Sequence, residues 1–280
     1  MITVKQFKFI FCILLISFLS GCQAGNGINL QLTPTKFDET ITVAAAADLQ
    51  FAFTDIANLY EQQTGRKVIL VFGSTGQLVQ QIENGASFDL VASANIEYID
   101  RLVNQGLAIS DSADLYARGR IVLAVNKKAG VQAVTLEDLL SDDIQYIAIA
   151  NPEHAPYGLA AKQALESLGL WEKLQQKLVY GENVRQALQF VQTGDAEAAI
   201  ISLSVANVPE ITWTLIDESL HRPLDQALAI LTTCKNPALA EDFIAFINGA
   251  EGRPIMRQYG FLLPDEIYLL TNQQPAVDEP

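Results

Sequence analysis

The chain has 280 residues, of which 50% are apolar and 18% charged, so it can form one large or two medium domains around a buried core. Its formal net charge is −14 and no stretch is basic, which argues against nucleic acid as a partner. The three cysteines and two histidines show no metal-ligand spacing, so neither a metal site nor a cofactor is expected.

The first 21 residues have the pattern of an export signal. Two lysines precede an apolar run at 9–19, which is too short to span a membrane and has the length of a signal-peptide core. The run ends in Leu19-Ser20-Gly21-Cys22, which resembles the processing site of bacterial lipoproteins. The resemblance implies cleavage before Cys22 and a lipid on that cysteine, which would anchor an extracytoplasmic protein to the membrane. An ordinary secretory signal is the alternative.

Processing at Cys22 would change the charge and the cysteine content. Removal of residues 1–21 takes away two lysines and no acidic residue, so the net charge changes from −14 to −16. Once Cys22 is acylated, only Cys234 remains free, which excludes an intrachain disulfide. Residues 22–37 are polar and contain glycine and proline, as expected of a flexible tether.

Strands and helices alternate through the first half of the remaining chain. Each apolar strand is followed by apolar residues at helical spacing and then by a glycine that ends the helix. The predicted strands are 41–47, 67–72 and 88–94, and the helices after them end at Gly65, Gly85 and Gly106. This alternation predicts a parallel sheet with helical crossovers.

The second half repeats the pattern. The predicted strands are 121–125, 146–150, 178–180, 198–202 and 227–232. Helices are expected from Thr135 with Asp138 in the capping-box position, from 157 to Gly169, after Asn183 with Gln186 in the capping-box position, after Asn236 and near 254–259. The tail after Pro264 is weakly patterned and is expected to fray.

The chain therefore reads as two α/β units in series. Extended runs at 121–125 and 227–232 can carry the chain from one sheet to the other and back. We predict a lobe I of residues 38–118 and 226–280, and a lobe II of residues 119–225. Ligands of open α/β sheets bind beyond the carboxyl ends of the strands, so the site is expected in the cleft between the lobes.

Four junctions between a strand and a helix have the composition of an anion site. At the clearest one, strand 67–72 stops at Gly73 and a helix starts after Ser74 and Thr75. Such a turn exposes backbone N–H groups and the positive end of a helix dipole. The other junctions lie at Asp48, Tyr157 and Val184, and Arg185 is the only basic residue among the four. Each alone could be a plain helix cap, but together they favour a small dianion held by N–H and hydroxyl donors.

A site built from donors also selects among oxyanions. Sulfate, molybdate and tungstate are fully deprotonated near neutral pH, whereas phosphate keeps a proton whose O–H group would lack an acceptor. A buried donor without a partner costs about 1–3 kcal/mol, so phosphate should be disfavoured. Sulfate stays an alternative to molybdate, because pocket size separates the two.

Six segments stand in a specific order along the chain. They are Val43-Ala-Ala-Ala-Ala-Asp-Leu49, Gly73-Ser-Thr-Gly76, Ile82-Glu-Asn-Gly-Ala86 with Phe88-Asp-Leu90, Asn151-Pro-Glu-His-Ala-Pro-Tyr-Gly158, Glu182-Asn-Val-Arg-Gln-Ala187 and Tyr259-Gly-Phe261. In this order they resemble the molybdate-binding proteins of bacterial ABC importers over about residues 40–261. These belong to the type II periplasmic-binding-protein class, in which two crossing strands form a hinge and the ligand lies between two lobes.

The resemblance implies a receptor rather than an enzyme. The receptor would bind molybdate or tungstate, hand it to an ABC permease, act as a monomer and carry no cofactor, with molybdenum present only as the bound oxyanion. Tyr157 and Val184 would contribute their backbone N–H groups. The oxyanion ligands that the resemblance implies are Ala47, Asp48, Ser74, Thr75, Tyr116, Tyr157 and Val184.

Two positions depart from the family pattern. Many members have a tyrosine on the strand after the Val184 helix, where this chain has Ser202, and Tyr116 fits the role that an interlobe tyrosine has in another branch. Asp48 stands where members often have serine or asparagine. Because a carboxylate repels a dianion, we assign the contact at Asp48 to the backbone and expect the carboxylate to cap its own helix.

A competing hypothesis is an enzyme that acts on a phosphorylated or sulfated small molecule through Asp48, His154 or Ser74. No nucleophile and base stand at a useful spacing, and His154 is expected to be a surface residue of a loop. The receptor hypothesis is therefore preferred.

Overall fold

The computed structural model describes residues 39–273, all of which belong to one compact unit. The expected signal peptide, the lipidation site Cys22 and the tether at 22–37 lie outside the described residues, as do residues 274–280. Within 39–273, every helix is too short or too polar to serve as a membrane span.

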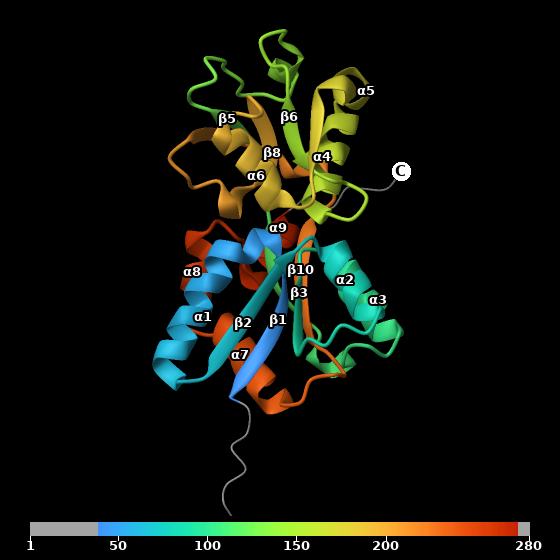
Figure 1. The fold of residues 1–280 in the computed structure, drawn as a ribbon, viewed down its shortest axis with the longest axis vertical. Helices are drawn as coiled ribbons and strands as arrows, with labels where there is room; N and C mark the ends of the chain where they lie inside the picture. Colours follow the sequence, from blue (N-terminus) through green and yellow to red (C-terminus); the bar gives the residue numbers. More distant parts are fainter. Residues whose placement is uncertain (1–38, 274–280) are drawn as a thin grey trace, which may run out of the picture. The chain divides into compact units, whose positions relative to one another are not determined.

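The first sheet has five strands in the order β2-β1-β3-β10-β4 (Figure 1). β1 pairs in parallel with β2 and β3, and β10 lies antiparallel between β3 and β4. Its strands are β1 (Thr40–Ala46), β2 (Lys67–Gly73), β3 (Leu90–Ser93), β4 (Asp114–Gly119) and β10 (Leu224–Ile230). Its helices are η1 (Ala47–Leu49), α1 (Gln50–Thr64), α2 (Thr75–Glu83), α3 (Ile96–Asn104), η2 (Ser110–Ser112), α7 (Pro237–Asn248) and α8 (Gly252–Gln258).

The second sheet comes from one continuous stretch of chain, in the order β7-β6-β8-β5-β9. β6 pairs in parallel with β7 and β8, and β5 lies antiparallel between β8 and β9. Its strands are β5 (Ile121–Asn126), β6 (Ile147–Ala150), β7 (Leu178–Gly181), β8 (Ala198–Ser202) and β9 (Ile211–Leu215). Its helices are η3 (Glu137–Leu140), α4 (Pro156–Ser167), α5 (Trp171–Leu174), η4 (Gln175–Lys177), α6 (Val184–Thr193), η5 (Leu203–Val205) and η6 (Glu218–Leu220).

Helices cover both faces of the first sheet, because successive side chains of a strand point to opposite faces. Val43 and Ala45 of β1 pack into the core beside α1 and α7, whereas Ala44 packs with α2 and α3. On the α1 side, Tyr60 and Phe243 stack edge to face with ring centroids 5.1 Å apart. The predicted two-lobed α/β fold is therefore confirmed at the level of its sheets and helices.

The chain passes between the sheets at two places. It leaves β4 at Gly119 and enters β5 at Ile121, and it leaves β9 at Leu215 and enters β10 at Leu224. An ion pair of 2.6 Å between Arg118 Nε and Asp225 Oδ1 ties the two crossing segments together. These segments are where a hinge between the sheets would bend.

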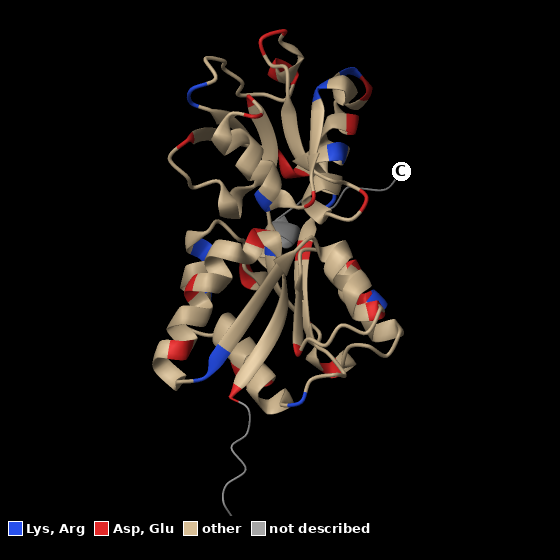
Figure 2. Ribbon diagram, viewed as in Figure 1, with Lys and Arg blue, Asp and Glu red and all other residues tan. Residues whose placement is uncertain are grey.

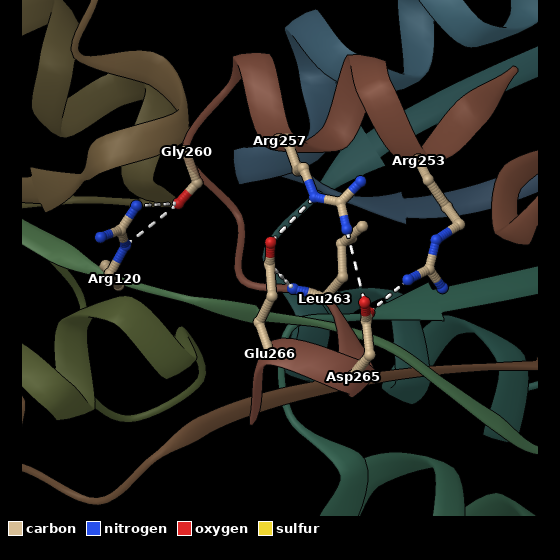
Figure 3. A network of polar contacts seen from close by, with 7 residues as sticks. All are labelled: Arg120, Arg253, Arg257, Gly260, Leu263, Asp265 and Glu266. Atoms are coloured by element: carbon tan, nitrogen blue, oxygen red, sulfur yellow. Dashed lines mark hydrogen bonds and ion pairs between the residues drawn. The ribbon is translucent and has the colours of Figure 1, made fainter. Parts of the chain in front are cut away.

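The expectation that the tail after Pro264 frays is wrong for residues 264–273, the part of the tail that the structure describes. Residues 264–273 form α9 (Pro264–Gln273), and Arg257 Nε donates to Glu266 Oε1 at 2.8 Å (Figure 3). Glu266 Oε2 also accepts from Leu263 N, and Arg120 in the first crossing donates to the Gly260 carbonyl. Ion pairs between α8 and α9, which apolar periodicity does not register, therefore hold the C-terminal helix, and the bonds from Arg120 to the Gly260 carbonyl attach this segment to the crossing.

Two further local expectations need correction. β9 was not expected, although its Ile-Thr-Trp-Thr-Leu sequence alternates as a strand should. The helix expected from Thr135 is the 3₁₀ helix η3, which begins two residues later. The Asp138 carboxylate still accepts from Val134 N and Thr135 N, as the predicted cap requires.

Candidate ligand-binding site

Five junctions between a strand and a helix meet at a small cavity of ≈ 10 Å³ between the two sheets. Six of the seven ligand residues expected from the sequence line it, and Tyr116 does not. Charged residues are spread over the outer helices and loops (Figure 2), and Asp48 is the only one in the lining. The lining consists of Ala46, Ala47, Asp48, Gly73, Ser74, Thr75, Ala94, Ala155, Pro156, Tyr157, Asn183 and Val184.

Thr75 is buried at the start of α2 and its hydroxyl is oriented by the next strand. Thr75 Oγ1 accepts a hydrogen bond of 3.1 Å from Ala94 N, directly after β3. Because this bond occupies a lone pair and not the proton, the Thr75 O–H can donate to an anion in the cavity.

The second lobe contributes two helix N-termini. Pro156 is the first residue of α4, so the N–H of Tyr157 is the first that this helix presents. Asn183 caps α6 as predicted, and its Oδ1 accepts from Arg185 N at 3.0 Å and Gln186 N at 3.2 Å. The cap engages these two groups rather than the N–H of Val184, which lies at the cavity.

Asp48 does not cap its own helix, contrary to expectation. No side chain caps η1 or α1, whose N-cap residues are Ala46 and Leu49. Instead Asp48 Oδ2 accepts from Tyr157 Oη at 3.0 Å and from Gln226 Nε2 at 2.8 Å. The carboxylate thus connects the first lobe to α4 of the second through Tyr157, whereas Gln226 lies on β10 of its own sheet.

The Asp48 carboxyl group is deeply buried, with 1% of the residue exposed. Burial raises its pKa from the ordinary 3.8 to about 6, and the bonds from Gln226 and Tyr157 oppose part of that rise. Oδ1 is buried and has no hydrogen-bond partner. The site therefore contains a carboxyl group whose charge is poorly compensated.

Gln226 is the residue of this network that sequence reasoning missed. It is fully buried on β10 and donates to both Asp48 Oδ2 and Tyr157 Oη, each at 2.8 Å. Tyr116 Oη in turn donates to Gln226 Oε1 at 2.8 Å, so Tyr116 reaches the cavity only through Gln226. The available signal was an amide directly before the apolar run at 227–230.

His154 was expected from the sequence to be a surface residue of a loop, and the structure shows otherwise. Its side chain is 22% exposed, and Nδ1 lies 2.7 Å from Ser74 Oγ. Its carbonyl accepts from Gly76 N at 2.9 Å and from Ser74 Oγ at 2.8 Å. A Cβ at residue 76 would lie 2.6 Å from this oxygen, so the contact between the lobes requires glycine there. Ser74 therefore holds the lobes together instead of capping α2.

The chain matches the model of the family described as bacterial extracellular solute-binding proteins over residues 41–262. A molybdate-binding protein ModA of Azotobacter vinelandii is 36% identical over 228 residues, which cover 79% of this chain and 89% of that protein. The chain therefore belongs to the family of bacterial extracellular solute-binding proteins. A second relative, from Bacillus subtilis, is described as a putative ABC transporter substrate-binding lipoprotein and is 32% identical to this chain. The match covers 90% of this chain and 96% of that protein.

Solved structures agree with the fold of this solute-binding protein. The periplasmic molybdate-binding protein of Azotobacter vinelandii matches with a TM-score of 0.75 at 31% identity, covering 80% of this chain and 99% of that one. The sulfate-binding protein SubI of Mycobacterium tuberculosis matches with a TM-score of 0.68 at 17% identity, which shows the fold alone. These relatives are binding proteins, which confirms the prediction of a receptor rather than an enzyme.

Asp48→Asn should stabilise the ligand-free protein at neutral pH. Below the ordinary pKa of 3.8 the group is neutral in both the folded and unfolded states, whereas above about 6 it is ionised in both and its burial costs about 3 kcal/mol. The gain in unfolding free energy should therefore grow between about pH 4 and 6 and stay constant above. Urea unfolding of both proteins across this range measures it.

Asp100→Asn, which neutralises an exposed carboxylate on α3, is the matched control and should give no such gain. Equal pH profiles for wild type and Asp48→Asn would show that the buried carboxyl group costs nothing.

Proposed function

We propose that the protein is an extracytoplasmic receptor that binds molybdate and delivers it to the permease of an ABC transporter. The observation that carries the proposal is the cavity lined by hydroxyl groups and helix N-termini, without lysine or arginine. Several relatives at 32–36% identity are named molybdate-binding proteins. Tungstate has the same charge and shape and is proposed as a second ligand.

The proposed contacts come from both lobes. Thr75 donates its hydroxyl, Tyr157 and Val184 donate backbone N–H groups, and the backbone of residues 47 and 48 completes the shell. Ser74 contributes less than expected because His154 already engages its hydroxyl. The shell is thus made of donors, which suits a fully deprotonated dianion.

Binding is proposed to require a hinge motion. A cavity of ≈ 10 Å³ has about the room of one water molecule, whereas a tetrahedral oxyanion has five heavy atoms. The lobes must separate to admit it, and the crossings at 119–121 and 215–224 are the segments that can bend. Tyr116 lies on β4, next to the first of these crossings.

The remaining parts of the proposal concern location and assembly. Cys22 is proposed to carry the lipid that anchors the receptor, with residues 22–37 as a tether. A relative of similar length is named a lipoprotein. One ligand per chain, bound between the lobes of the same chain, makes a monomer sufficient for function.

Molybdate and tungstate should stabilise the mature domain, because they bind only the folded state. At a concentration a hundredfold above the dissociation constant the gain is about 2.7 kcal/mol. Thermal unfolding with molybdate, tungstate, sulfate and phosphate tests this. Phosphate should have little effect, and equal stabilisation by phosphate would exclude a site made of donors alone. A larger effect of sulfate than of molybdate would assign the receptor to sulfate.

Thr75→Val should weaken molybdate binding about ten- to a hundredfold. The substitution keeps the shape and removes one charge-assisted hydrogen bond, worth about 1.5–3 kcal/mol. Thr75→Ser, the matched control, keeps the hydroxyl and should bind nearly as wild type. Calorimetric titration measures the affinity of both variants for molybdate. An unchanged affinity in Thr75→Val would show that the oxyanion binds elsewhere.

Gly119→Ala should oppose closure selectively. A Cβ on Gly119 would overlap the hydroxyl of Tyr157, which belongs to the opposite lobe, and would come within 2.8 Å of Gln226 Nε2. Affinity for molybdate should fall at least about tenfold, since each tenfold loss corresponds to about 1.4 kcal/mol. Small-angle scattering should show less compaction with ligand than in wild type. Adding Tyr157→Phe, which removes the overlapping oxygen, should restore part of the compaction. If Gly119→Ala alone compacts as much as wild type, that result would contradict the closed arrangement.

Cys22→Ser should release the protein from the membrane without altering its affinity, because the tether lies outside both proposed lobes. Fractionation of cells and titration of the released protein measure the two effects. A variant that stays in the membrane would show that the apolar run at 9–19 is an uncleaved anchor.

A further inference from the structure

Asp48 is the one residue of the described cavity lining whose side chain has a buried polar atom without a hydrogen-bond partner. Tyr157 Oη and Gln226 Nε2 both donate to Oδ2. Oδ1 is buried without a partner among the described residues. The two oxygens thus differ: one accepts from two fixed donors, and the other, in a residue of the cavity lining, has no partner.

An ionised Asp48 would oppose the proposed ligand. A carboxylate beside a dianion is a contact between like charges in a dry site, where water does not screen it. The other lining residues are uncharged, so no cation in the lining offsets the repulsion. A short-range donor at this position would instead add a bond to the anion.

The titratable groups around Asp48 do not supply a compensating charge. Tyr157 on α4 and Tyr116 on β4 have pKa values raised well above the usual range, by burial and then by the Asp48 charge, so both phenols stay neutral. Arg185 on α6 is not part of the lining: its Nε donates to Gln50 Oε1 at 2.9 Å, its guanidinium lies 4.5 Å from the ring of Phe51, and its Nη1 is buried without a partner. Serine 204 on η5 donates to the main-chain oxygen of Asp48, not to its carboxyl group.

We propose that Asp48 holds the oxyanion as a neutral carboxylic acid, with a proton on Oδ1 that is donated to a ligand oxygen, so that each dianion is captured together with one proton. The inference rests on the proposed function, because it needs a dianion in the cavity. The proton in this binding step comes from solvent and goes to the carboxylate. No covalent bond of the oxyanion is made or broken. The donors on Oδ2 leave Oδ1 as the oxygen that carries the proton.

This mechanism makes affinity depend on pH. Burial already raises the pKa of Asp48 to about 6, and a neighbouring dianion raises it further. Above the pKa of the ligand-free protein, binding must take up one proton, so the association constant should fall about tenfold per pH unit. Below it, the acid is already protonated and the affinity should level off. Molybdate itself is fully deprotonated near neutral pH, so this slope would belong to the protein.

One other pair could produce a similar slope. His154 Nε2 lies 4.0 Å from Glu182 Oε2 on the same lobe, and its Nδ1 contacts Ser74 on the other. Because histidine is the side chain that most often changes charge near neutral pH, this contact between the lobes needs a control. A variant without the imidazole therefore accompanies any change at Asp48.

The test is calorimetric titration of the mature protein with molybdate at several values between about pH 6 and 8.5, in two buffers of different ionisation enthalpy. Wild type should take up about one proton per molybdate near pH 8. Asp48→Asn keeps the size and presents a permanent N–H donor in place of Oδ1. It should bind at all these values with no proton uptake and no slope, matching wild type near pH 6 and exceeding it at least tenfold near pH 8.

His154→Gln should retain the slope and the proton uptake, whatever it does to the affinity itself. A flat wild-type profile would overturn the inference and leave the proposed function intact. A slope that persists in Asp48→Asn, or weaker molybdate binding in that variant, would also overturn it, because the carboxylate would then accept a proton from the ligand or play no part. No molybdate binding by wild type at any pH would instead overturn the proposed function.

Discussion

A chain of buried hydrogen bonds at Asp48 joins the two lobes where they meet. Tyr116 donates to Gln226, and Gln226 and Tyr157 donate to the same carboxylate oxygen. Ser204 adds a bond of 2.8 Å to the Asp48 main-chain oxygen. The participants lie on η1, β4, β10, α4 and η5, so elements of both lobes, including the strands next to the two crossings, meet in one network. In a buried site such bonds polarise and reinforce one another, and losing one leaves the others unsatisfied.

Recognition in this protein has to act at short range. The full chain carries a net charge of −14, so its long-range field repels anions. Attraction can begin only near the cavity, where helix N-termini and the Thr75 hydroxyl converge. Dipoles of this kind act over a few ångströms, which favours capture by closure over electrostatic steering. Slow association with a long-lived closed complex is the expected kinetic pattern for such a site.

Local patterns in the sequence were sufficient for most of the fold. Apolar periodicity and terminal glycines place the central strands and the helices of both sheets, because burial of one face dictates that spacing. Elements held by charge pairs were missed, as for α9, where Arg257 and Glu266 make the contacts. The edge strand β9 was missed although its apolar and polar residues alternate; in the structure it lies at the edge of the sheet with only Ile211 buried.

The candidate site was predictable in part. The junctions at Asp48, Thr75, Tyr157 and Val184 are local features, and they line one cavity in the structure. The partners of Asp48 were not predictable, since Gln226 is 178 positions away and only the fold brings it close. The roles of His154 and Ser74 were hidden for the same reason. Contacts between lobes depend on tertiary geometry that no local pattern contains.

The position of β10 at the interior of the first sheet has a consequence for the order of folding. The second sheet is complete within 121–215, whereas the first needs Leu224–Ile230 to bridge β3 and β4. During synthesis the first sheet therefore stays incomplete until residues 224–230 have emerged. Such long-range pairing is slow to form. For the export proposed above, that delay is an advantage, because a polypeptide that has not yet closed its first sheet can still be threaded through a translocation channel.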